Sequence, residues 1–94
     1  MKVTITDPWL GEREIGPGAA IIYDQLKLLR QWRDTRANPS QHLLDDIKVY
    51  EFIVSSQDPD LYTEKYMLEM GRLRSIKGVY HAKKMDAAKN LGWF

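Results

Sequence analysis

The sequence predicts a mostly α-helical domain of three or four packed helices with a short N-terminal β-hairpin. Three observations support this fold class. Apolar residues recur at helical spacing from residue 19 onward, proline follows a capping residue at two points where a helix would begin, and residues 2–6 alternate with the period of a strand. At 94 residues the chain can build one hydrophobic core. We therefore expect residues 1–94 to form a single domain.

The composition is that of an ordinary globular protein, with 44% hydrophobic and 29% charged residues. The chain has no cysteine, which excludes disulfides and thiolate metal sites and is typical of a reducing compartment. Its N-terminal residues lack the apolar run of a secretory signal, and no stretch approaches the roughly 18 uncharged apolar residues of a membrane span. We expect a cytoplasmic protein with no membrane partner.

The hairpin and a loop are predicted within residues 1–18. Val3 and Ile5 alternate with polar residues, residues 7–11 form a turn, and residues 12–15 can return as a second strand before the glycines and proline of residues 16–18 end it. A two-stranded hairpin is marginally stable by itself. The hairpin is therefore expected to lie on the helices or on a partner.

Two helices are predicted over residues 19–36 and 39–56. The first carries one broad apolar stripe that is expected to pack against the other helices, formed by Ile21, Ile22, Leu26, Leu28, Leu29 and Trp32. The second is predicted to begin with Asn38 as N-cap, Pro39 at the first helical position and Gln41 in a capping box. Its buried stripe is expected to be Leu43, Ile47, Tyr50 and Val54.

A third helical segment is predicted over residues 59–90, with Asp58 as N-cap and Pro59 in the first turn. The acidic Asp60 is expected to complement the dipole of this helix. The apolar stripe comprises Tyr62, Tyr66, Met70, Leu73, Ile76 and Tyr80. The segment forms either one long helix or two helices that meet near Gly78, with Gly92 as the C-terminal stop.

Basic residues are concentrated at the C-terminal end. Residues 71–94 contain six basic residues and one acidic residue, which gives this segment a formal charge of +5. Residues 1–70 have a formal charge of −4, so the +1 of the whole chain conceals an uneven distribution. Such a segment can contact phosphate or an acidic protein surface, or can face only solvent. The candidate contacts are Arg72, Arg74, Lys77, Lys83 and Lys84, with Lys27, Arg30 and Arg33 as a possible second basic set.

No catalytic, metal or cofactor site is expected. The two imidazoles, His42 and His81, lie in different predicted helices, and there is no thiol to complete a zinc site. The serines lack a glycine-flanked elbow and an evident base. The sequence therefore favours a protein that is not an enzyme.

Three aromatic residues fall outside the helical stripes and are candidate anchors for a protein partner. Trp9 lies in the predicted hairpin turn, and Trp93 and Phe94 end the chain. Large rigid rings dominate the energetics of many interfaces. The alternative is that these rings close the ends of a small core.

The function predicted from these features is a non-catalytic protein-binding regulator or inhibitor of a larger host enzyme or complex. The chain is similar to small phage-encoded accessory proteins that bind and redirect a host enzyme. The similarity lies in its size and in the lack of cysteine and of a catalytic constellation, and no residue motif supports it. The alternative is a nucleic-acid-binding protein, including DNA binding, that uses the basic C-terminal segment. A structural subunit remains a third reading, and the oligomeric state is open.

Overall fold

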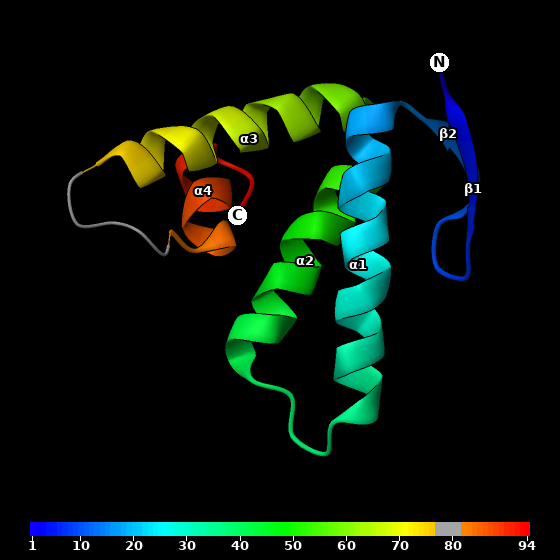
Figure 1. The fold of residues 1–94 in the computed structure, drawn as a ribbon, viewed down its shortest axis with the longest axis horizontal. Coiled ribbons are helices and arrows are strands. Elements are labelled where there is room, and N and C mark those ends of the chain that lie inside the picture. The colour runs from blue at the N-terminus through cyan, green and yellow to red at the C-terminus, as the bar shows by residue number, and fades with distance from the viewer. Residues whose placement is uncertain (77–81) are drawn as a thin grey trace.

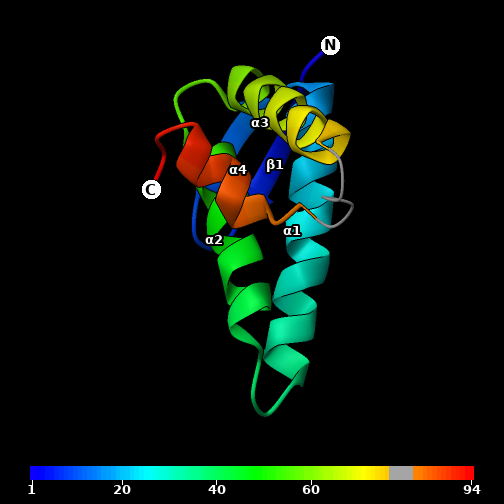
Figure 2. The same ribbon diagram turned by 90° about the vertical axis from the view of Figure 1, so that its left-hand side faces the viewer.

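Four helices and one β-hairpin form the fold, as the sequence predicted (Figure 1). The computed structural model describes residues 1–76 and 82–94. The elements in chain order are β1 (Val3–Asp7), β2 (Gly11–Ile15), α1 (Pro17–Thr35), α2 (Gln41–Ser55), α3 (Pro59–Ser75) and α4 (Lys84–Asn90). Helices α1 and α2 lie side by side, α3 crosses one end of this pair, and α4 packs against α2 and α3 (Figures 1 and 2). The hairpin lies beside α1.

The hairpin is antiparallel, with Val3 opposite Ile15 and Asp7 opposite Gly11. Gly11 has a φ of +74°, a left-handed conformation that closes a three-residue connection and suits glycine. The Asp7 carboxylate accepts hydrogen bonds from the backbone N–H groups of Trp9 and Leu10, each at 2.9 Å. The turn predicted over residues 7–11 is thus built by the aspartate that begins it.

The same Asp7 carboxylate holds the hairpin to the helices. It is buried, and its second oxygen accepts hydrogen bonds from the Tyr23 hydroxyl at 3.0 Å and from the Arg30 guanidinium. Arg30 also donates to Glu51 on α2, at 2.7 Å from Nη2. One arginine therefore joins the hairpin, α1 and α2 through two carboxylates. Burial acts to raise the pKa of Asp7, but the hydrogen bonds from Leu10, Arg30, Trp9 and Tyr23 outweigh it and hold the pKa below its usual value.

A second aspartate fixes the N-terminal end of α1 against α3. Asp60, in the first turn of α3, accepts hydrogen bonds from the backbone N–H of Gly16 at 2.8 Å and of Ala19 at 3.4 Å. Asp60 was predicted to complement its own helix, and the structure shows that it also satisfies the free N–H groups at the start of α1. Gly16 permits this contact because a Cβ there would overlap the Asp60 carboxylate.

The predicted helix starts at residues 19 and 39 need correction, since α1 begins at Pro17 with Gly16 as its N-cap. Helix α2 begins at Gln41 and not at residue 39, because Ser40 is the N-cap and its hydroxyl accepts a hydrogen bond from the Leu43 N–H at 3.2 Å. Serine and asparagine cap helices about equally well, so the pattern could not select between Asn38 and Ser40. Gln41 donates to Asp45 at 2.9 Å, so its side chain does not complete the predicted capping box.

The segment predicted as helical over residues 59–90 contains two helices, since α3 ends at Ser75 and α4 begins at Lys84. The break predicted at Gly78 lies outside the described residues. Gly92 ends α4 as predicted, with a φ of +80°. Its N–H donates to the Lys89 carbonyl and the Trp93 N–H donates to the Ala88 carbonyl, both at 3.0 Å, which is the Schellman pattern of a glycine stop.

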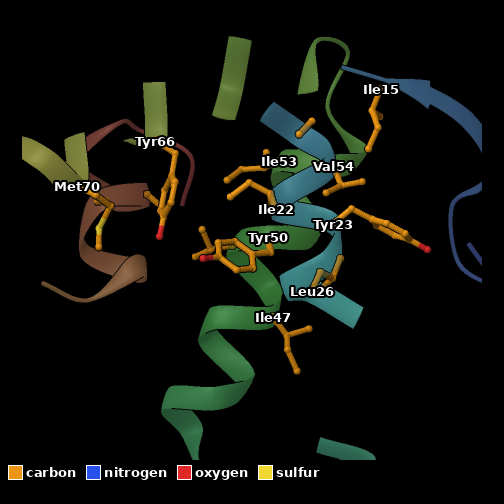
Figure 3. Close-up of a cluster of buried hydrophobic side chains, with 14 of the residues drawn as sticks. Ile15, Ile22, Tyr23, Leu26, Ile47, Tyr50, Ile53, Val54, Tyr66 and Met70 are labelled. Atoms are coloured by element: carbon orange, nitrogen blue, oxygen red, sulfur yellow. The ribbon is translucent and has the colours of Figure 1, made fainter. Parts of the chain in front are cut away.

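The core lies between α1 and α2 and continues to α3 through Tyr50 (Figure 3). Ile22 and Leu26 of α1 are fully buried, as are Ile53 and Val54 of α2. The Tyr50 ring meets Tyr66 of α3 edge to face, with ring centroids 5.8 Å apart. In the part of the chain that the structure describes, no helix is long and apolar enough to cross a membrane.

Part of the apolar stripe of α1 does not pack in the core, contrary to expectation. Ile21, Leu28 and Trp32 are 56%, 46% and 43% exposed. At about 100° per residue the six stripe residues span about 160° of the helix circumference, wider than the contact with α2 covers. Ile21, Leu28 and Trp32 are spaced i, i+7 and i+11 and form a strip beside that contact, which we call the α1 strip.

Two glycine substitutions test the contact between α1 and α3. Gly16→Ala should lower the free energy of unfolding by about 1–3 kcal/mol, because the new methyl group displaces the Asp60 carboxylate from its N–H donors. Gly71→Ala is the matched control: its Cβ meets nothing within 4 Å, and alanine in the interior of α3 should raise stability by about 0.5–1 kcal/mol. Urea unfolding measures the free energy of unfolding of both variants. Equal changes in the two variants would contradict the contact assigned between Asp60 and the start of α1.

Replacing Asp7 tests whether its buried carboxylate stabilises the folded state. Asp7→Asn should cost about 2 kcal/mol at neutral pH, because Arg30 keeps its burial and loses a charged partner. The pKa of Asp7 is lowered in the folded state, so its contribution is present above the unfolded pKa of about 3.9 and is lost as pH falls through the folded pKa. The stability difference between wild type and variant should thus shrink below about pH 4. A difference that stays constant with pH would contradict this role.

Candidate functional site

The described surface has one groove formed by side chains from all four helices. Two adjoining cavities of about 300 and 290 Å³ make up this groove and share Gln25, Tyr50 and Lys84. The first is also lined by Tyr66, Met67, Met70, Gly71 and Arg74, and the second by Leu28, Leu29 and Trp32. We call the two together the α1–α3 groove. The helices that build it face the viewer in Figure 2.

Tyrosine hydroxyls form the polar part of the groove. Tyr50 donates to the Gln25 side-chain oxygen at 2.9 Å, which orients both groups. Burial, followed by the neighbouring Tyr50 hydroxyl, raises the pKa of Tyr66, and burial likewise raises the pKa of Tyr50. Both hydroxyls therefore stay protonated and neutral at physiological pH.

The apolar part of the groove is exposed. Leu28 and Trp32 of the α1 strip line one of the two cavities, and Met67 of α3, which is 47% exposed, lines the other. Scattered exposed apolar residues are normal on any protein. Here, however, they lie on two helices that line the same groove, which is the arrangement typical of binding surfaces.

The charge of the groove comes from two of the predicted basic residues, Arg74 and Lys84. The Lys84 amine is 3.5 Å from the carboxylate of Asp46, which His42 also approaches at 3.4 Å. Every acidic side chain lies within residues 1–76 and 82–94, and none of them is within ion-pair distance of Arg74. Arg74 and Lys84 are the charged side chains among the described residues that line the groove, and both are cationic.

The other predicted basic residues are placed elsewhere. Arg72 of α3 does not line the groove and pairs with Glu69 through hydrogen bonds from Nε, at 2.9 and 3.1 Å, and from Nη2, at 2.5 Å. This contact holds the pKa of Glu69 below its usual value, and Glu69 also accepts a hydrogen bond from Asn90 of α4 at 3.1 Å. Lys83 is exposed just before α4, and Lys77 lies outside the described residues. In the second basic set, Lys27 and Arg33 pair with neighbouring aspartates on α1, and Arg30 belongs to the buried network.

Trp93 packs within the molecule. Its ring stacks on Tyr62 at 5.1 Å and on Phe52 at 5.3 Å between ring centroids. Phe94 also contacts Phe52, at 5.2 Å, yet remains 43% exposed. The two terminal residues thus join α2 to α3, and only Phe94 presents a substantial surface to solvent.

Trp9 lies away from the groove, at the tip of the hairpin on the other side of α1 (Figure 1). It is 62% exposed and borders a shallow cavity of about 400 Å³ beside Arg33 and Glu51. Among the predicted anchors, Trp9 is the most exposed. The structure therefore separates the three anchors into a hairpin tip and a C-terminal aromatic cluster.

The sequence prediction missed Leu28, Trp32 and Met67 as surface residues. Helical spacing assigned the first two to the core, and the only available signal was a stripe too wide for one helix contact. In residues 1–76 and 82–94 no group of three or more histidine or acidic side chains is arranged to hold a metal ion, and His81 lies outside these residues.

Two tryptophan substitutions compare the stability contributed by a packed ring with that contributed by an exposed ring. Trp93→Ala should lower the free energy of unfolding by about 2 kcal/mol, because two stacked contacts and partly buried area are lost. Trp9→Ala should change stability by less than about 0.5 kcal/mol, because most of that ring faces solvent. Urea unfolding compares the two, and a stable Trp93→Ala variant would contradict the stacking role.

Comparisons with known proteins identify no relative. No protein-family model matches the chain, and no curated protein or solved structure resembles it at a significant level. The function is therefore argued from the groove, the exposed aromatic residues and the distribution of charge in this chain.

Proposed function

We propose that this protein is a non-catalytic protein-binding module that regulates or inhibits a larger enzyme or complex. The observation that carries the proposal is the α1 strip, where Ile21, Leu28 and Trp32 leave an apolar face of α1 uncovered beside an open groove. A small domain gains stability by burying such residues, so their exposure is consistent with a partner that covers them. A chain without cysteine also suits the reducing cytoplasm, where we propose that it acts.

The placement of charge also favours a protein partner. Among the described residues, Arg72 and Lys84 are paired with carboxylates and Arg30 is committed to the buried network, so three of the predicted basic side chains already have acidic partners. Trp9 adds an exposed aromatic side chain on a second side of the molecule. Exposed aromatic residues are typical protein-interface anchors.

Nucleic-acid binding is the second candidate, and one observation favours it. Within the described part of the chain, Arg74 and Lys83 have no acidic partner and are exposed. Both are therefore available to phosphate. Binding of this kind would weaken steeply with salt, because each neutralised phosphate releases counterions.

The deciding experiment is capture of partners from a bacterial lysate with tagged full-length protein, with and without nuclease. A specific partner should survive nuclease treatment and salt between about 50 and 200 mM, a range over which phosphate contacts lose orders of magnitude in affinity. Trp32→Ala or Trp9→Ala should reduce its capture by about tenfold or more. Leu68→Ala is the control, since Leu68 is 68% exposed on the outer face of α3, away from the groove.

Loss of all captured material on nuclease treatment would reject the protein-binding proposal in favour of the nucleic-acid candidate. Retention of the partner by both tryptophan variants would mean that neither surface is the interface. Circular dichroism of each variant confirms that the fold is intact before capture is compared.

A further inference from the structure

We propose that the α1–α3 groove binds an amphipathic helical segment of a partner protein that carries acidic residues. This inference rests on the proposed protein-binding function and names the chemistry of the occupant. The apolar side chains of that segment would cover Leu28, Trp32 and Met67, and one of its carboxylates would lie between Arg74 and Lys84.

The length of the wall that α1 contributes to the groove fits a helix of about two turns. Gln25 and Trp32 both line the groove and lie seven residues apart on α1, which corresponds to about 10 Å along the helix axis. A bound helix presents apolar anchors at i, i+3 or i+4, and i+7 over the same distance. In the adjoining cavity, Met67, Gly71 and Arg74 lie at i, i+4 and i+7 of α3, so Gly71 leaves space for a side chain between Met67 and the guanidinium.

The charge of the groove selects an acidic occupant. The charged side chains among its described lining residues are Arg74 and Lys84, and Arg74 has no carboxylate partner among residues 1–76 and 82–94, which contain every acid of the chain. A carboxylate from a partner would give Arg74 a charge-assisted hydrogen bond that the folded chain does not supply. A basic segment would instead meet the unpaired guanidinium of Arg74, with no free carboxylate among the described lining residues to receive it, and be rejected.

A helix fits this groove better than a phosphate backbone does. Exposed apolar side chains line both cavities of the groove, Trp32 in one and Met67 in the other. A phosphate chain recovers nothing from covering aliphatic and thioether groups, whereas an amphipathic helix buries them.

Methionine methyl groups offer a direct readout on the whole protein. The four methionines are Met1, Met67, Met70 and Met85, and Met67 and Met70 line the groove whereas Met1 is fully exposed before β1. The protein, labelled with ¹³C at the methionine methyl groups, is titrated with a helical peptide of about 15 residues that has leucine at i, i+3 and i+7 and glutamate beside them. A second peptide has lysine in place of each glutamate.

The acidic peptide should shift the Met67 and Met70 signals saturably and leave Met1 unchanged, and the lysine peptide should shift none. Arg74→Glu and Trp32→Ala should each weaken binding by about tenfold or more. The matched controls are Arg72→Glu and Leu68→Ala, at two exposed α3 residues that do not line the groove, and both variants should bind within about twofold of wild type.

Equal shifts with both peptides, or no shift with either, would overturn the proposal. Concentration-dependent Met67 shifts without peptide would show a second copy of this chain in the groove. Shifts caused by a single-stranded oligonucleotide and not by the acidic peptide would assign the groove to nucleic acid. If the captured partner binds through Trp9 and is unaffected by Arg74→Glu, the protein-binding function stands and the assignment to this groove fails.

Discussion

The buried contact between Asp7 and Arg30 is the interaction on which the arrangement of the other elements depends. A two-stranded hairpin is marginal in water, and this one is held to α1 by a carboxylate that also builds its turn. Arg30 continues the connection to Glu51 of α2. Burying these charges is costly unless each is hydrogen-bonded, and here all the partners are present, so the network specifies one position for the hairpin.

Helix ends supply the next level of organisation. Asp60 of α3 accepts from the first N–H groups of α1, and Arg13 of β2 donates to the carbonyls of Val54 and Ser56 at the end of α2. Polar groups that each helix leaves free at its ends are thus satisfied by a different element. Because α3 is fixed across α1 and α2, its Met67 and Arg74 line a cavity that adjoins the one lined by Leu28 and Trp32, and the groove follows from that crossing.

The sequence singled out individual candidate residues, but it could not predict which of them the fold brings together. Trp9 was recognised because it falls in a turn, and its high exposure agrees with that reading. Arg74 and Lys84 were identified as members of a basic segment, whereas their separation from Arg72 depends on which face of α3 meets the core. Trp32 was assigned to the core because helical spacing says which residues share a face and not how much of that face a neighbour covers.

By itself the sequence determined the fold class, the hairpin, the proline-marked helix starts to within a few residues, and the glycine stop at Gly92, because these depend on local periodicity and capping chemistry. It also determined the concentration of basic residues near the C-terminus. Only the tertiary structure decided that Trp93 stacks on Phe52 and Tyr62, that Asp60 caps α1, and that a cationic and apolar groove lies between α1 and α3. These features join residues distant in the chain, and their geometry depends on how the helices cross, which no local pattern encodes.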